Sequence, residues 1–339
     1  MTLSLFVLWK IKAGKLGTNM RTTVVIPNYN GIEYLKACLN SLHKSEDVPY
    51  KIIVVDDGST DESVQYVKDR YPDVRIIVHE TNKGFASSVN TGIEASDTEF
   101  VLLLNNDTVI EEHFVDNMQK ALDADDKIFS ASAKMLKLND PDMVDGAGDY
   151  YCALGWAYAH GKDKKAVTVT RPRNIFSSCA GAAIYRRDVL VSLGMFDERH
   201  FAYLEDVDVG YRANIAGYRN VYVPDAVVLH AGSGFSGSRY NEFKVRLSSR
   251  NSTYLICKNM PLIQQLINLP FFIIGFGIKF LFFLSKGYGL IYLRGLFAGI
   301  KMGYDAEGRA KRVRFNPGNL GNYIRIQLQL WVNILRRFT

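Results

Sequence analysis

A chain of 339 residues has room for one large folded domain and an appendage, and its 47% hydrophobic and 22% charged residues exclude intrinsic disorder as a general description. Much of the basic excess behind the net charge of +6 lies after residue 240, so its position is more informative than its size, and we expect no nucleic acid as a partner. Four cysteines stand far apart without metal-ligand spacing, so we expect reduced thiols in a cytosolic setting and neither a zinc site nor a disulfide framework.

Residues 1–19 precede the first clear strand. Their apolar stretch at 3–9 has no basic stretch before it and no small-residue cleavage site after it, so it is a poor match to a signal peptide. Met20 stands directly before the strand. We therefore expect translation to start at Met20 and residues 1–19 to be an extension outside the folded domain.

Strands and helices alternate from residue 20 to about residue 122. The pattern predicts strands at 23–26, 51–55, 74–78 and 100–104, and helices at 32–42, 62–69, 85–94 and 112–122. Such βαβ repetition, with right-handed crossovers, predicts an α/β fold with a Rossmann-like, mostly parallel sheet flanked by helices. Sheets of this kind bind ligands beyond the carboxyl ends of their strands, and a nucleotide is the natural ligand.

The strand at 51–55 is apolar on both faces and ends in Asp56 and Asp57. A doubly apolar strand belongs in the middle of a covered sheet, so these two carboxylates are predicted to face a pocket. The alternative is an ordinary turn in which Ser59 or Thr60 caps the next helix. For Asp56 a purely structural role remains open.

The turn after the first strand argues against a dinucleotide-binding oxidoreductase. It reads Pro27-Asn-Tyr-Asn-Gly31 and has no G-x-G-x-x-G, and the chain has no P-loop lysine motif. A bound diphosphate therefore needs another source of positive charge, and a divalent metal held by carboxylates is the obvious one.

Two further groups of acids follow apolar segments. Asp107 comes after the strand at 100–104 and should emerge at the same sheet edge as Asp57, although it also suits a cap for the helix that follows. Glu205, Asp206 and Asp208 crowd the start of a predicted helix behind an aromatic segment. A carboxylate in such a partly buried setting has its pKa moved toward the working range of a base.

In order along the chain, these residues resemble the inverting family-two glycosyltransferases with the GT-A fold. The resemblance covers about residues 22–260. It rests on the segments 25–31, 56–61, 82–85 with Asn90, 104–107, 178–183, 194–198, 205–206 and 230–233.

The resemblance implies a nucleotide-sugar site. Pro27, Asn28 and Asp57 would hold the base and ribose, with Lys83 and Gly84 in a loop beside them. Asn105 and Asn106 would also contact the donor. Gly181 would leave room for its sugar, with simple close packing as the alternative for this residue.

The same resemblance implies the chemistry. Asp107 would bind Mg²⁺ or Mn²⁺ between the two phosphates, and His230 would be a further metal ligand, with a hydrogen-bonded structural role as the alternative for the histidine. Asp206 would be the general base, and Glu205 would orient it or line the acceptor site. Many relatives carry D-x-D where this chain has Asn105-Asn-Asp107; the Asn-Asn-Asp form resembles the rhamnosyl- and galactofuranosyltransferase branch.

Asp208 has no firm role at this stage. Arg212, one helical turn further on, is a candidate ion-pair partner for its carboxylate.

The C-terminal region differs in character. Residues 269–284 are apolar except for Lys279, but this run is shorter than the ~20 residues that cross a bilayer comfortably. Basic residues interleave with aromatics as far as Arg314, which suits the surface of an anionic leaflet. A hairpin packed on the catalytic domain or on a homodimer partner is the alternative. A last helix is predicted at 323–335.

These observations predict a catalytic domain at 20–260, with a nucleotide-binding half at 20–122 and an acceptor half at 123–260, followed by a membrane-associated helical region at 261–339. The predicted activity is the inverting transfer of a sugar from a dTDP- or UDP-sugar, with dTDP-rhamnose among the candidates, to a saccharide or lipid-linked acceptor in surface polysaccharide synthesis. The predicted location is the cytoplasmic face of the cell membrane, with the cytoplasm as the second choice. A nucleotidyltransferase acting on a sugar phosphate and a non-catalytic glycan-assembly protein remain the alternatives.

Overall fold

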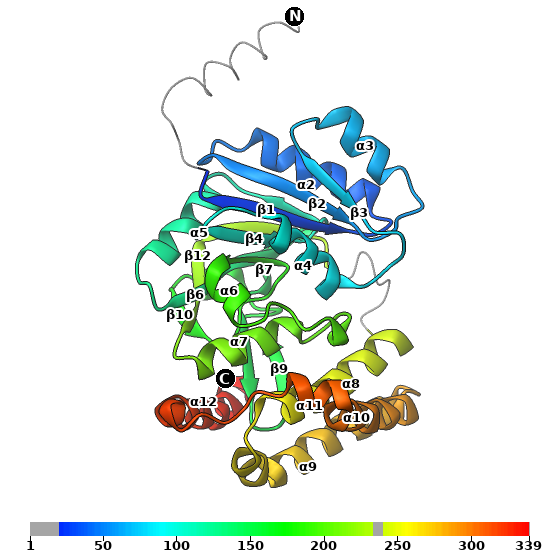
Figure 1. Ribbon diagram of the computed structural model, residues 1–339, viewed down its shortest axis with the longest axis vertical. Helices are drawn as coiled ribbons and strands as arrows, with labels where there is room; N and C mark the ends of the chain where they lie inside the picture. The colour runs from blue at the N-terminus through cyan, green and yellow to red at the C-terminus, as the bar shows by residue number, and fades with distance from the viewer. Residues whose placement is uncertain (1–19, 233–239, 339) are drawn as a thin grey trace, which may run out of the picture.

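The computed structural model describes residues 20–232 and 240–338. The expectation for residues 1–19 lies outside these ranges, as does Ser233 at the end of the His230 segment. Ten described strands form one sheet in the order β10-β12-β6-β11-β4-β1-β2-β3, with β5 beside β12 and β7 beside β6 (Figure 1). The C-terminal helices gather at the end of the molecule opposite β3 and α3 (Figure 1).

The first half alternates strands and helices, and all eight predicted elements are confirmed. They are β1 (Thr22–Asn28), α2 (Ile32–Lys44), β2 (Tyr50–Asp56), α3 (Ser63–Arg70), β3 (Arg75–Val78), α4 (Phe85–Ala95), β4 (Phe100–Leu104) and α5 (Phe114–Asp123). Strands β4, β1, β2 and β3 are parallel. Side chains of α2 and α5 pack on one face of these strands and side chains of α4 on the other, which explains why the strands are apolar on both faces.

The register of these strands places their polar ends together. Asn28, the last residue of β1, pairs with Asp56, the last residue of β2. Strand β4 lies on the other side of β1 and ends at Leu104, so Asn105 and the residues after it follow at the same edge. The predicted meeting of ligand residues at one edge of the sheet therefore results from pairing in register.

The second half continues the same sheet with mixed strand directions. Its strands are β5 (Thr108–Ile110), β6 (Ile128–Lys137), β7 (Asp140–Gly146), β8 (Asp149–Cys152), β9 (Trp156–Ala159), β10 (Arg173–Ile175), β11 (Ala182–Arg186) and β12 (Arg219–His230); its helices are α6 (Arg187–Ser192) and α7 (Glu205–Ile215). Strand β11 runs antiparallel between β4 and β6, and β8 and β9 form a separate hairpin.

Strand β12 is long and irregular. Its register against β6 shifts between Val223 and Val227, around Pro224, which has no N–H to donate to a neighbouring strand. Beyond the shift, His230 pairs with Thr108 of β5 and Lys137 of β6. This pairing carries the histidine to the strand ends of the first half.

The C-terminal region is helical, as predicted, but one helix is longer than the sequence indicated. The elements are α8 (Glu242–Asn259), α9 (Leu262–Ser285), α10 (Gly289–Tyr304), α11 (Ala306–Lys311) and α12 (Leu320–Phe338). Helix α9 has 24 residues, so the prediction that its apolar run is too short to cross a bilayer is wrong as to length. The polar residues Gln264 and Asn268 interrupt the apolar pattern in its first turns, so the sequence did not indicate that the helix begins there. Both side chains are nevertheless buried against neighbouring helices.

Candidate active site

A cleft of 880 Å³ lies at the carboxyl ends of β1, β2 and β4. The hairpin β8–β9, the start of α7, the end of β12 and the start of α8 complete its walls. Eleven of the twelve predicted site residues line it: Pro27, Asn28, Asp57, Gly84, Asn105, Asn106, Asp107, Gly181, Glu205, Asp206 and His230. Lys83 does not line the cleft; its side chain is exposed to solvent.

Asp57 organises the loop that follows β3. Its carboxylate accepts hydrogen bonds from the backbone amides of Lys83 (3.0 Å) and Gly84 (2.9 Å), and His79 Nδ1 lies 2.8 Å away. Lys83 thus contributes its backbone to the site. The carboxylate has further lone pairs, and the residue lines the cleft, so it can also accept from a ligand.

Asp56 has the structural role that the sequence left open. It is fully buried and accepts hydrogen bonds from the amide and hydroxyl groups of Ser59 and from Asn28 Nδ2. Asn28 Oδ1 in turn accepts from Asn106 Nδ2 at 2.7 Å. The ends of β2, β1 and β4 are therefore joined by side chains as well as by the sheet.

Two glycines allow segments to approach closely. Gly84 has φ +89, and a Cβ atom there would lie 2.6 Å from the Phe201 ring. At Gly181 a Cβ would lie 3.1 Å from Asn105 Nδ2, and the Gly181 carbonyl accepts from the Asn105 amide. Both positions hold the cleft walls together, so close packing accounts for part of the predicted role of Gly181.

His230 lies between two carboxylates. Its Nε2 is 3.2 Å from Asp107 Oδ1 and its Nδ1 is 2.8 Å from Asp145 Oδ2, while Asp145 also pairs with Lys162. Burial lowers the pKa of His230, but the two carboxylates outweigh it and raise the value to about 9. The imidazole is therefore a cation at neutral pH.

Asp107 and His230 together offer the donor atoms that a divalent metal needs. Asp107 Oδ1 is buried, and His230 Nε2 at 3.2 Å is its polar neighbour among the described residues. A carboxylate oxygen beside an imidazole nitrogen suits Mg²⁺ or Mn²⁺, and a metal at this point would replace the positive charge of the histidine proton. Six acidic residues line the described cleft, against Lys162 and His230 as its basic residues, so a further cation here would favour the binding of a diphosphate.

A second group of acids lies across the cleft, around Asp206. Burial raises the pKa of Asp206 to about 6. The backbone amide of Val207, which donates to Asp206 Oδ1 at 2.7 Å, lowers this pKa but does not outweigh burial. Asp149, Cys179 and Asp206 offer ligand atoms within 4.8 Å of one another. Burial, and next the charge of Asp206, raise the pKa of Asp149 well above its ordinary range. The pair therefore holds one ionised carboxylate and one protonated carboxyl near neutral pH.

Glu205 is more enclosed than Asp206. It is buried, and its Oε2 has no hydrogen-bond partner among the described residues. Burial, reinforced by the charge of Asp206, raises the pKa of Glu205 well above its ordinary range. The protonated form of Glu205 is therefore favoured beside the Asp206 carboxylate.

The loop before α7 is held in an unusual conformation. Phe201, Tyr203 and Leu204 have φ angles of 64°, 72° and 68°, which non-glycine residues rarely adopt. The fully buried Asn251 donates its side-chain amide to the carbonyls of residues 200, 202 and 203 at 2.7–3.0 Å. Asn251 therefore fixes the loop that positions Glu205 and Asp206.

Asp208 belongs to a separate buried network. It pairs with Arg212 one helical turn away (2.6 Å) and with Lys258 of α8 (2.9 Å). Burial opposes ionisation, but these two cations hold the pKa of Asp208 well below its usual range. The predicted partnership of Arg212 with Asp208 is confirmed; Asp208 ties α7 to α8, and Arg212 ties α7 to the carbonyls of Leu193 and Met195, outside the cleft.

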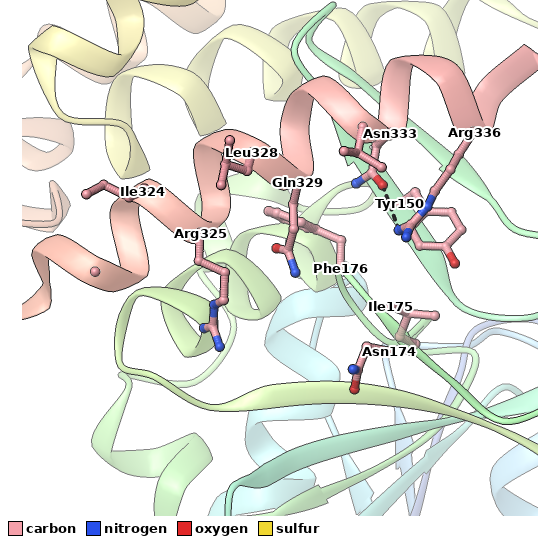
Figure 2. A pocket seen from close by; sticks show the side chains of 12 residues that line it. Tyr150, Asn174, Ile175, Phe176, Ile324, Arg325, Leu328, Gln329, Asn333 and Arg336 are labelled. Atoms are coloured by element: carbon pink, nitrogen blue, oxygen red, sulfur yellow. Dashed lines mark hydrogen bonds between the residues drawn. The ribbon is translucent and has the colours of Figure 1, made fainter.

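Another cavity, of 470 Å³, lies between α12 and β10 (Figure 2). Figure 2 shows its polar side chains, among them Arg325, Gln329 and Asn333, with the Asn333–Arg336 hydrogen bond of 3.1 Å. None of its described lining residues is acidic. The predicted metal ligands and the predicted base all line the larger cleft and not this cavity.

Reading the sequence missed Asp145, Asp149 and Asn251. Asp145 and Asp149 flank Gly146-Ala-Gly148, an acid pair around glycines that resembles the Asp56–Asp57 turn and offered a signal. Asn251 lies within a helix and offered none.

Comparison with known proteins agrees with this geometry. The family model described as "Glycosyl transferase family 2" matches residues 23–194. An N-acetylglucosaminyl-diphospho-decaprenol L-rhamnosyltransferase of Mycobacterium tuberculosis is 28% identical over 232 residues, which cover 61% of this chain and 75% of that protein. The resemblance found in the sequence is thereby confirmed.

Solved structures share the fold. S. aureus TarS 1–349 in complex with UDP-GlcNAc has a TM-score of 0.54 at 19% identity, covering 94% of this chain and 85% of that one. The mannosyltransferase PcManGT from Pyrobaculum calidifontis, in complex with GDP-Man and Mn²⁺, has a TM-score of 0.51 at 17% identity, covering 96% and 92%. The expected α/β GT-A architecture with C-terminal helices is confirmed.

Proposed function

Because the chain belongs to glycosyl transferase family 2, we propose that it moves a sugar from a nucleotide diphosphate sugar to a saccharide or lipid-linked acceptor with inversion, in surface polysaccharide synthesis. The observation that carries this proposal is one cleft with two separate groups of acids. A buried Asp107 oxygen lies beside the His230 imidazole in one group, and Asp206 has a pKa of about 6 in the other.

The donor's nucleotide would lie at the ends of β1 and β2. Asp57, Asn28 and Pro27 offer hydrogen-bond acceptors and an apolar contact there. A dTDP- or UDP-sugar is the proposed donor, with dTDP-rhamnose favoured by the name of the mycobacterial relative. The UDP-GlcNAc held by the structural neighbour supports a nucleotide sugar in the same fold.

Asp107 and His230 would hold Mg²⁺ or Mn²⁺. When bound, the metal neutralises the charge that grows on the departing diphosphate. His230 must give up its proton before it can bind a metal, and Asp145 holds the ring in place through Nδ1. The Mn²⁺ in the mannosyltransferase supports a metal-dependent reaction.

Asp206 is the proposed general base. Its carboxylate accepts the proton of an acceptor hydroxyl as that oxygen bonds to the anomeric carbon from one side. The bond from the same carbon to the diphosphate oxygen breaks on the opposite side, and the nucleoside diphosphate leaves with its electron pair. A pKa of about 6 keeps Asp206 ionised at neutral pH and basic enough to take the proton. Neutral Glu205 would donate a hydrogen bond to the acceptor or to Asp206.

We assign nucleotide binding to residues 20–122 and acceptor binding to residues 123–260, whose β9 and α7 line the far side of the cleft. The relative's decaprenol-linked acceptor supports action at the cytoplasmic face of the membrane.

The test is a thermal-stability screen of UDP-, dTDP- and GDP-sugars with and without Mn²⁺, in wild type, Asp107→Asn and Asp142→Asn. Asp142 is exposed and outside the cleft, so its variant is the matched control. The metal-dependent stabilisation should persist in the control and fall at least tenfold in apparent affinity in Asp107→Asn. Equal stabilisation of all three proteins would contradict a metal at Asp107. Release of pyrophosphate instead of nucleoside diphosphate during turnover would indicate a nucleotidyltransferase.

A further inference from the structure

Helices α9 and α10 expose large apolar side chains to solvent along one side of each helix. On α9 these include Leu262, Leu266, Ile273 and Leu281, and on α10 Leu290 and Phe297, each 60–70% exposed. We call these six residues the apolar docking face. Large apolar side chains exposed in this number mark a contact with a partner or a membrane.

On α10 basic residues alternate with the apolar ones. Leu290, Arg294, Phe297 and Lys301 follow one another at spacings of four, three and four residues, so they share one stripe of the helix, and all four are exposed. Arg294 and Lys301 make no ion pair with the described residues. Apolar groups flanked by free cations are typical of helices that lie at the interface of an anionic bilayer.

The opposite side of α9 contacts the catalytic domain near its start and in its middle, and α10 near its end. Near its start Gln264 accepts a hydrogen bond from Tyr211 of α7 at 2.8 Å, and in its middle the Gly275 carbonyl accepts from Trp156 of β9 at 3.1 Å. Near its end the Phe283 ring lies 5.1 Å from Tyr292 of α10. If α9 crossed a bilayer, these elements and the polar cleft they border would enter the hydrocarbon, where unpaired polar and charged groups cost several kcal/mol each.

The charge of the C-terminal region indicates whether a bilayer or a second copy of the chain covers the apolar docking face. Residues 262–338 contain eleven Lys and Arg residues against two acids, while the rest of the chain is net negative. Both acids, Asp305 and Glu307, already pair with Arg199. A two-fold dimer through this face would bring its free cations together, whereas an anionic lipid surface attracts each of them.

We infer that the apolar docking face lies on an anionic lipid surface, with α9 in the plane of the interface and not across the membrane. This inference rests on the proposed function for its purpose. The C-terminal helices hold strand β9 in place. Trp156 of β9 donates to α9, and the Tyr158 hydroxyl donates to the Asn333 carbonyl of α12 at 2.6 Å. Ala157, Tyr158 and Ala159 of β9 line the cleft, so the acceptor side of the site rests on the C-terminal helices. A lipid-linked saccharide would reach this wall without leaving the membrane surface.

The first experiment measures flotation of the full chain with vesicles of phosphatidylcholine alone or with 30 mol% phosphatidylglycerol. Arg294→Glu/Lys301→Glu should lower partitioning onto the anionic vesicles at least tenfold, and Leu266→Ser/Leu281→Ser should lower it on both kinds. Lys68→Glu, on exposed α3 at the far end of the molecule, is the control and should bind like wild type. Binding unaffected by the four substitutions would overturn the inference.

A second experiment tests the orientation of α9. Single cysteines at Leu262→Cys and Ser285→Cys, at the two ends of the helix, are exposed to a membrane-impermeant maleimide outside sealed vesicles, with the unsubstituted protein as background. Labelling of both ends is expected; protection of one end would show that α9 crosses.

A dimer in vesicle-free solution that Leu266→Ser/Leu281→Ser dissociates would identify a second copy as the occupant. Hydrolysis of the donor sugar by wild type without vesicles tests the proposed function separately. If wild type hydrolyses no donor, the proposed function fails, while the result on vesicle binding still stands.

Discussion

Replacing Asp206 with asparagine should abolish sugar transfer and at the same time stabilise the fold at neutral pH. The amide oxygen can still accept the hydrogen bond from Val207, but the side chain can no longer take a proton from an acceptor. The variant should therefore bind donor and metal like wild type and lose transfer by at least a thousandfold. These opposite effects distinguish a base from a residue that merely supports the structure.

The gain in stability follows from the pKa. Burial raises the pKa of Asp206 from 3.8 to about 6, so the ionised carboxylate costs the folded state up to about 3 kcal/mol above pH 6. Below pH 3.8 the group is protonated in both folded and unfolded chains, and the cost vanishes. Between these values the unfolded chain releases its proton first, so wild type loses stability relative to the variant as pH rises.

Urea denaturation of both proteins at pH 4 and pH 8, with donor-binding and transfer assays at pH 8, checks this reasoning. The difference in free energy of unfolding should be near zero at pH 4 and favour the asparagine variant by about 1–3 kcal/mol at pH 8. Near-normal transfer would remove Asp206 from the role of base. Equal stabilities at both pH values would show that its carboxylate is not desolvated in the folded protein.

Two further variants probe the groups around this carboxylate. Asp149→Asn should keep transfer within about fivefold of wild type and keep the acid limb of the pH–rate profile near pH 6, because burial already holds Asp149 as a neutral carboxyl that an amide can imitate; a loss as severe as that of Asp206→Asn would mean that Asp149 works ionised. Asn251→Ala should lower the free energy of unfolding by about 2–3 kcal/mol in urea and lower kcat, because the carbonyls of residues 202 and 203 lose the Asn251 amide and that of residue 200 keeps only its other donors, Arg250 and the Ala202 amide; unchanged kcat in a destabilised protein would show that the loop keeps its shape without Asn251.

The first half of the fold was predictable because its signals are local. Apolar runs such as 100–104 alternate with helical patterns, and parallel strands then place Asp57 and Asp107 at one edge by geometry. The length of α9 was not predictable in the same way. Gln264 and Asn268 interrupt its apolar pattern, and only their partners Tyr211 and Gln327 explain why polar residues are buried there.

The candidate site divides along the same line. The sequence alone determined which residue types end the strands, and thereby the polar edge of the sheet and the family, and it predicted Asp107, Asp206 and His230 as site residues. Only the tertiary structure decided that Asp149 lies beside Asp206, that Asp145 holds His230 and that Lys83 contributes its backbone alone. The physical reason is that strand endings are set by local patterns, whereas a pKa depends on burial and on charges brought together from distant parts of the chain.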